Sequence, residues 1–500
     1  MGTHTHAIST TSPEAQKFFN QGLNLLYGFN RYEALRSFRR AAELDPQAVM
    51  PRWGMAMVQG PHINMDLDVD VQTKESCEAV REGLQLRERA PERERAYLDA
   101  VATRCPEYKP AAYIDAMRSL AAQYPDDLDA ATLYAESLMV PVRWKWWSQD
   151  GKPAQGVEEA IRVLEAVLRR RPDHPGANHF YIHAVESSPT PERAIPSAQR
   201  LMGIVPAAGH LVHMPGHIWL LTGEYELAAA TNQRAVQVDR EYMQKTGVTG
   251  SAYVGYYIHN LHFVAYARQM QGRMAVAIRA AEELAGAASP YAQDMAAMAD
   301  AFVPAPLFAY LRFARWDDIL KSKPPDPKLL ASTALWHFAR ACALRAQGQS
   351  DEARKEATAF EAARSKVPAD WIWLNNKARD LLAVAAEVLA ARLAADDLAA
   401  VPHWKRAIEL QEALIYDEPP AWYYPLRESL GAALLRAGRA AEAETVFREG
   451  AAKSPRNGRM LFGLLESLKA QNKTAAAEMV RREFEAAWRR ADVKLSIREL

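Results

Sequence analysis

One helical pattern occurs three times in the middle of the chain, as AIRVLEAVLRRRP at 160–172, AIPSAQRLMGIVP at 194–206 and AAATNQRA at 228–235. The leading alanines, Ala160, Ala194 and Ala228, are equally spaced along the chain. The first two copies end in proline, which stops a helix because it lacks a backbone donor. The same helical unit therefore recurs at a fixed interval.

This interval, about 34 residues, is the period of the tetratricopeptide repeat (TPR), a pair of antiparallel helices. The signature also occurs nearer both ends of the chain, led by Ala34, Ala353 and Ala443. No β-pattern of useful length interrupts it. The sequence predicts an all-α fold, a TPR-type α-solenoid whose helix pairs form a right-handed superhelix with a concave groove.

The chain of 500 residues is too long for one compact core, but a repeat array avoids that limit. The segment KSKPPDPK at 321–328 is the best candidate for a hinge, because its prolines stop a helix. We expect an N-terminal array over 1–320 and a C-terminal array over 321–500 that closes the superhelix.

Histidines are concentrated in and after the repeated units. Seven of the thirteen fall between His179 and His262, where an even distribution would place about two. His179 and His183 are four residues apart, and His213 and His217 repeat that pair exactly one repeat interval later. Residues three and four apart share a helix face. The predicted groove is therefore lined by seven histidines: His179, His183, His210, His213, His217, His259 and His262.

Neutral imidazoles are common ligands of copper, zinc and iron. Two histidines at i and i+4 can hold one ion from a single helix. The glutamate of the HExxH zinc motif is absent here, and the nearest carboxylate is Glu186, three residues after His183. An almost all-imidazole set favours copper, in a mononuclear or dinuclear site, with zinc or iron as alternatives.

Composition excludes several other classes of protein. Lys+Arg and Asp+Glu are 61 each, so no basic surface for nucleic acid is expected. No apolar run is long enough for a transmembrane helix. The N-terminus lacks the apolar core of a signal peptide, which predicts a cytoplasmic protein, or a periplasmic one if a leader is missing from this sequence. The oligomeric state stays open.

Two further expectations concern cysteines and the first residues. Cys77, Cys105 and Cys342 are odd in number and widely spaced, which indicates buried thiols rather than disulfides. His4 and His6 lie in an end that we expect to be disordered.

The sequence favours a metal-dependent enzyme that oxidises or oxygenates a small organic substrate. Glu186 and Tyr257 are the candidate catalytic residues. Candidate substrate contacts are Asn64, Asn178, Tyr181, Trp219, Asn260, Trp422, Tyr423 and Tyr424. Two alternatives remain: a TPR scaffold that binds a peptide or protein partner in its groove, and a zinc- or iron-dependent hydrolase or lyase that uses the same histidines.

Seven segments together resemble a family of bacterial TPR proteins, most of which carry no assigned function. The segments are FFNQGLNLLYGFN, EALRSFRRAAELDP, WGMAMVQGPHIN, NHFYIHAVE, HLVHMPGHI, YYIHNLHF and PPAWYYPLRESLGAALL. The resemblance covers nearly the whole chain and implies the TPR fold and the importance of the histidine segments. Family members more often have asparagine at the position of His62, which implies that Asn64, rather than His62, lines the groove.

Overall fold

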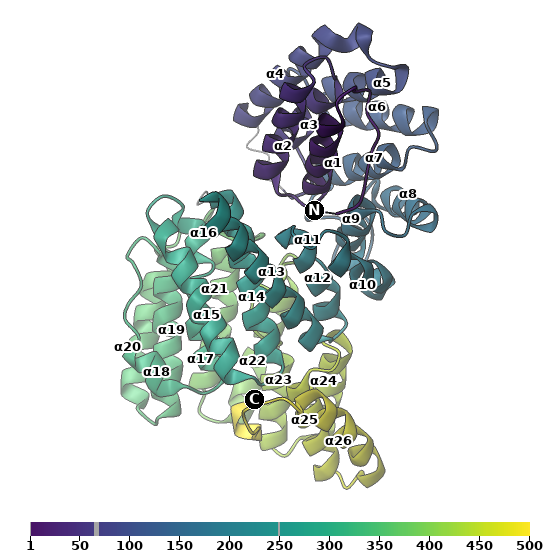
Figure 1. The fold of residues 1–500 in the computed structure, drawn as a ribbon. Coiled ribbons are helices and arrows are strands. Elements are labelled where there is room, and N and C mark those ends of the chain that lie inside the picture. Colours follow the sequence, from purple (N-terminus) through teal and green to yellow (C-terminus); the bar gives the residue numbers. More distant parts are fainter. Residues whose placement is uncertain (1, 65–69, 249–250) are drawn as a thin grey trace. The chain divides into compact units, whose positions relative to one another are not determined.

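The computed structural model describes residues 2–64, 70–248 and 251–500 (Figure 1). Contacts divide the chain into two compact units, Met1–Ile218 with Gln237–Thr246, and Trp219–Val236 with Gly247–Leu500. Helices α12 (Pro215–Leu221) and α13 (Tyr225–Thr246) contribute residues to both. The segment 321–328 lies inside the second unit, and the predicted division at residue 320 stays a prediction.

The first unit is a succession of helices that pack on their neighbours in sequence. They are α1 (Pro13–Tyr27), α2 (Arg31–Leu44), α3 (Met50–Gln59), α4 (Asp70–Leu86), α5 (Glu92–Ala102), α6 (Pro110–Gln123), α7 (Leu128–Met139), α8 (Val157–Arg170), α9 (Pro175–Glu186), α10 (Ile195–Ile204) and α11 (Gly209–His213). Helices α1 and α9 are distant in sequence but pack on each other. That contact positions the candidate site described below.

The second unit continues the same architecture. Its helices are α14 (Ser251–Met270), α15 (Met274–Ala288), α16 (Ala296–Asp300), α17 (Ala305–Arg312), α18 (Trp316–Lys321), α19 (Leu330–Ala346), α20 (Ser350–Arg364), α21 (Ala378–Leu393), α22 (Asp397–Glu412), α23 (Arg427–Arg436), α24 (Ala440–Lys453), α25 (Gly458–Ala470) and α26 (Thr474–Trp488). A two-residue antiparallel pair, β1 (Ile372–Trp373) and β2 (Asn376–Lys377), precedes α21.

The repeat signature is explained by packing inside each helix pair. Phe38 on α2 is fully buried, and its ring lies so close to Gly22 on α1 that an added Cβ there would come within 2.7 Å. Phe447 on α24 has the same relation to Gly431 on α23, at 2.6 Å. A large side chain in the second helix therefore requires a small residue in the first. The prediction of an all-α, TPR-type fold is confirmed.

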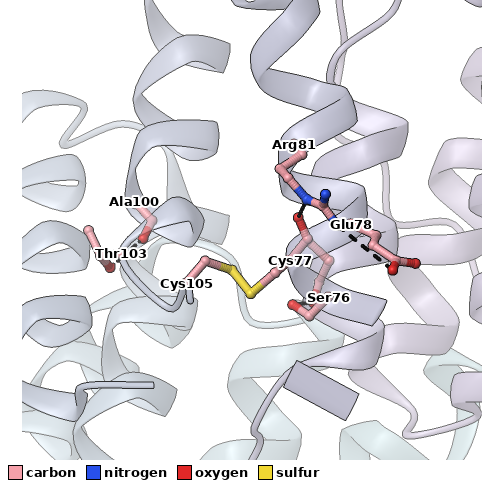
Figure 2. Close-up of a disulfide and its surroundings, with 8 residues drawn as sticks. Ser76, Cys77, Glu78, Arg81, Ala100, Thr103 and Cys105 are labelled. Atoms are coloured by element: carbon pink, nitrogen blue, oxygen red, sulfur yellow. Dashed lines mark hydrogen bonds and ion pairs between the residues drawn. A yellow bond between two sulfur atoms is a disulfide. The ribbon is translucent and has the colours of Figure 1, made fainter. Parts of the chain in front are cut away.

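The expectation that all three cysteines are thiols was wrong for two of them. Cys77 on α4 and Cys105, which follows α5, form a disulfide with their Cα atoms 5.6 Å apart (Figure 2). Their 28-residue separation matches no short motif, so only the packing of α4 on α5 reveals the pair. Cys342 is a buried free thiol, as expected.

The expected disorder of His4 and His6 was also wrong. His4 donates from Nε2 to Oδ1 of Asp129 at 2.9 Å, and His6 donates from Nδ1 to Oδ2 at 2.9 Å. Both imidazoles and the carboxylate are buried. A buried carboxylate needs charged or hydrogen-bonding partners. Asp129 on α7 has two of them, His4 and His6, in the segment that precedes α1, which we call the N-terminal arm.

Among the helices of the described residues, none is both long and apolar enough to cross a membrane.

Candidate metal centre

Three helices carry the repeated histidine pairs: α9 carries the first pair, and α11 and α12 share the second. His174 caps α9 by accepting from the backbone N–H of Ala177 at 3.1 Å, and Pro175 takes the first helical position. The second pair is split, because α11 ends at His213 and α12 begins at Pro215. A proline cannot continue the preceding helix, so His213 and His217 lie on separate short helices.

His179 and His210 meet at the centre of the cluster. His179 donates from Nδ1 to the backbone carbonyl of Tyr27, at the end of α1, at 2.6 Å. That bond fixes the tautomer and leaves a lone pair on Nε2. The Nε2 atoms of His179 and His210 are 3.1 Å apart. A tetrahedral ion about 2.0 Å from each nitrogen would hold them about 3.3 Å apart, so the observed separation suits two ligands of one ion.

His183 supplies the clearest ligand atom. Its Nδ1 donates to Oε1 of Glu186 at 2.9 Å, and its Nε2 is buried without a hydrogen-bond partner. An orphaned buried lone pair costs roughly 1–3 kcal/mol, unless a metal ion accepts it. One ligand atom each of His179, His183 and His210 lies within 4.8 Å of the others.

Glu186 joins the two histidine pairs. Its second oxygen, Oε2, accepts from Nδ1 of His217, whose Nε2 lies 2.7 Å from Nε2 of His213. Carboxylates behind metal-bound histidines commonly hold the ring in this orientation. His179, His183 and His217 thus each donate from Nδ1, the first to a backbone carbonyl and the other two to Glu186, and each keeps a lone pair on Nε2.

The charges of the cluster suit a cation. Burial lowers the pKa of His179 and of His210 well below the usual value, and neighbouring histidines lower both further. Burial raises the pKa of Glu186, but His217 and His183 outweigh it and bring that pKa to about 2. The neutral imidazoles of His179 and His210 therefore lie near one ionised carboxylate, which suits the binding of a divalent ion.

Aromatic rings pack around the histidines. The ring of Phe29 lies 4.5 Å from that of His179 and 5.0 Å from that of His62, between centroids. Trp146 is buried, and the centroid of its ring lies 5.8 Å from that of His183. His62 is itself buried and accepts from the backbone N–H of Asn64 at 3.2 Å. His62 is therefore part of the packing beside the cluster, which the resemblance did not indicate.

Other predicted contacts in the first unit have identified partners. Asn178 donates through Nδ2 to the backbone carbonyls of Pro172 and His174 at 2.8 and 2.9 Å. Tyr181 donates to Oε1 of Glu165 at 2.7 Å. These bonds stabilise α9 and its contact with α8. A role in substrate binding stays a prediction for both residues.

The remaining predicted residues belong to the second unit. Tyr257, His259, Asn260 and His262 lie on α14, and Trp219 lies in the segment 219–236. Tyr257 donates to Oε1 of Glu283 at 2.6 Å, and burial lowers the pKa of His262 to about 4. Their roles in catalysis and metal binding stay predictions.

The aromatic segment Trp422, Tyr423 and Tyr424, also in the second unit, is buried before α23. Tyr423 stacks on Phe308 with centroids 4.6 Å apart. Substrate binding by this segment stays a prediction too.

A second cluster in the first unit was missed by sequence reasoning. Asp129 also accepts from the hydroxyl of Tyr27 at 2.6 Å and lies 3.2 Å from Nε2 of His174. With His4 and His6 this makes four donors on one buried carboxylate. Its members come from four segments that are distant in sequence. No motif or spacing in the sequence links them, so only the fold reveals the cluster.

The described residues confirm that histidine and acidic side chains gather where they could hold an ion. The sequence-based preference for copper rests on the ligand types alone.

Comparisons with known proteins add little beyond this geometry. No family model matches the chain, and no curated protein matches it. Among solved structures, the chain is similar to the TPR domain of P58(IPK), with 12% identity, a TM-score of 0.24, and 92% of this chain and 99% of that chain covered. It is also similar to the APC/C hetero-tetramer Cut9-Hcn1, with 10% identity, a TM-score of 0.30, and 96% and 97% covered. Both TM-scores lie below 0.5, so we infer nothing further from either protein.

Proposed function

We propose that the first unit is a helical-repeat scaffold that binds one transition-metal ion through His179, His183 and His210. The observation that carries the proposal is the buried Nε2 of His183, which has no hydrogen-bond partner and lies beside the fixed lone pair of His179. Glu186 orients His183 and supplies negative charge behind it. His213 and His217 extend the cluster and could hold the same ion or a second one.

The metal we propose is copper or zinc, with iron third, since imidazole suits all three. Three imidazole ligands leave a fourth position for water or substrate, as catalytic sites do. Oxidation of a small organic substrate stays a prediction, because the geometry supports binding and not a reaction. The Cys77–Cys105 disulfide favours an oxidising compartment, so of the two compartments predicted we propose the periplasm.

Metal titration of the purified chain tests the proposal. After removal of metal with a chelator, addition of Zn²⁺ or Cu²⁺ should saturate near one equivalent, or two if His213 and His217 form a separate site. The unfolding free energy should rise by about 3 kcal/mol when the free ion is 100 times its dissociation constant. Less than about a tenth of an equivalent bound, with no stabilisation by either ion, would contradict the proposal.

The pH dependence of the metal-free protein provides an independent check. The pKa values of His179 and His210 lie well below 6.5 in the folded chain and return to about 6.5 on unfolding. Their contribution to stability is therefore full above pH 6.5 and is lost as the pH falls below it. As the pH falls below 6.5, each of these two histidines should reduce the unfolding free energy by about 1 kcal/mol per pH unit.

Urea unfolding at pH 7.5, 6.5 and 5.5 measures this slope. His179→Gln with His210→Gln should flatten it, because glutamine does not titrate. His6 works in the opposite sense: hydrogen bonding to Asp129 raises its pKa against the effect of burial. An unfolding free energy that does not change between pH 7.5 and 5.5 would contradict the assignment of neutral, buried imidazoles.

A second candidate function is the binding of a peptide or protein partner, and a feature of the second unit favours it. A cavity of about 510 Å³ is lined by charges of both signs, including Glu224, Glu226, Glu483, Arg456, Arg489 and Arg490. Charged side chains of both signs can complement the charges of a polar peptide segment. Ala486→Trp, which would fill the cavity from α26, should abolish partner binding and leave metal content unchanged.

A further inference from the structure

Three arginines of the second unit surround a small cavity that the proposed function does not use. Arg312 ends α17, Arg392 is on α21 and Arg459 is at the start of α25. The cavity has a volume of about 10 Å³, and Tyr423 and Leu500 complete part of its wall. That volume is about the space that one water molecule needs.

The cluster carries more positive than negative charge. Arg312 forms a bidentate ion pair with Glu428, and both side chains are buried. Arg459 is 4% exposed and donates to two neutral acceptors, the backbone carbonyls of Arg312 at 2.7 Å and of Glu499 at 2.9 Å. In the described part of the chain, no carboxylate pairs with Arg392 or Arg459. One buried carboxylate, that of Glu428, thus faces three guanidinium groups, and the carboxylate of Glu499, also in the cavity wall, acts on Arg459 as well.

Several donors around the cavity have no acceptor. The buried Nε of Arg312, of Arg392 and of Arg459 each lacks a hydrogen-bond partner, and so does the hydroxyl of Tyr423. Unsatisfied buried donors are costly, and those of charged groups more so. Burial, and then the charge of Arg312, lower the pKa of Arg459 to about 9. An acceptor with a negative charge would satisfy the donors and the charge together.

We propose that this cavity binds one small monovalent anion, either a halide ion or a single carboxylate group. Space for about one water molecule limits the cavity to one such group, and Arg312, Arg392, Arg459 and Tyr423, each with an unpartnered donor, line it. The anion would neutralise the positive charge that Glu428 leaves uncompensated. This site is separate from the histidine cluster and independent of whether that cluster binds metal.

The alternative is that the cavity holds water and the excess charge stays unpaired. The two cases predict opposite effects of one substitution, Arg392→Met. Replacing an unpaired buried charge with an apolar side chain of similar length stabilises a protein. Removing a ligand of a bound anion destabilises it and ends its response to the anion.

Urea unfolding of the full chain at constant ionic strength tests the proposal, with sodium gluconate replaced stepwise by sodium chloride or sodium formate. Gluconate is too large for the cavity. The folding equilibrium constant should rise roughly tenfold when the anion reaches ten times its dissociation constant. A response to chloride identifies a halide site, and a response to formate alone identifies a carboxylate site.

Variants separate the site from general salt effects. Arg392→Met should lose the response, and Tyr423→Phe should weaken it while changing stability little without anion. Arg364→Met, which removes a partly exposed arginine of α20 paired with Glu361 at 2.7 Å, should keep the response to the anion. The proposal is overturned if neither anion affects the wild type, or if Arg392→Met is more stable than the wild type and still responds.

Discussion

His183→Ala is expected to remove most of the metal bound by the first unit, with a loss of affinity of at least 100-fold. His183 contributes a buried Nε2 without any other partner, and its loss leaves His179 and His210 as two ligands of an ion that needs four. Metal content after dialysis against a weak chelator measures the effect. Circular dichroism should stay near that of the wild type, because a repeat array depends mainly on contacts between neighbouring helices.

Glu186→Gln gives a finer version of the same experiment. Glutamine keeps the shape of the side chain but removes the charge that orients His183 and His217. Changes to such supporting carboxylates typically cost 10–100-fold in metal affinity. Glu186→Gln should therefore fall between the wild type and His183→Ala.

His403→Ala is the matched control. His403 also pairs its Nδ1 with a glutamate, Glu387, at 2.7 Å, but lies partly exposed on α22. Its substitution should leave metal content unchanged. If His183→Ala and Glu186→Gln both retained full metal occupancy, His183 would be a packing residue and the proposed centre would be wrong.

The parts of the fold and site that could be predicted are those that repeat. The equally spaced alanines predict α8 and α10 correctly, and the matched pairs predict that His179, His183, His213 and His217 gather. Periodicity specifies which residues share a helix face. It also predicts that Glu186 lies beside these histidines, since that residue is one helical turn after His183.

Contacts between distant segments could not be predicted in this way. The carbonyl of Tyr27 sets the tautomer of His179 only because α1 packs on α9, which no local pattern indicates. The Cys77–Cys105 disulfide joins segments in the same manner. Isolated histidines have no repeated spacing to mark them, yet His4 and His174 share one carboxylate. Their partner, Asp129, lies on α7, whose sequence contains no motif that marks this residue.

The Asp129 cluster leads to the second large expected effect: Asp129→Ala should lower the unfolding free energy by roughly 3–5 kcal/mol. The carboxylate accepts from His4, His6, His174 and the hydroxyl of Tyr27, all of them buried. Burial raises its pKa, but these histidines outweigh burial and hold that pKa well below the usual range. Removing the carboxylate leaves four buried donors without their acceptor.

Asp126→Ala is the control for this experiment, because Asp126 lies three residues away and its exposed carboxylate pairs with Arg170 at 2.7 Å. A surface ion pair contributes about 0–1 kcal/mol, so the control should unfold almost as the wild type does. Urea unfolding at pH 7 provides both values.

A double-mutant cycle then assigns the loss to the N-terminal arm. In a chain with His4→Ala and His6→Ala, two of the four donors are already gone, so Asp129→Ala should cost less than in the wild type. The difference between the two costs measures the coupling of the arm to α7 and should exceed about 1 kcal/mol for groups in direct contact. Equal costs in both backgrounds would show that the arm contributes nothing, and that Asp129 acts only through His174 and Tyr27, which attach α9 and α1 to α7.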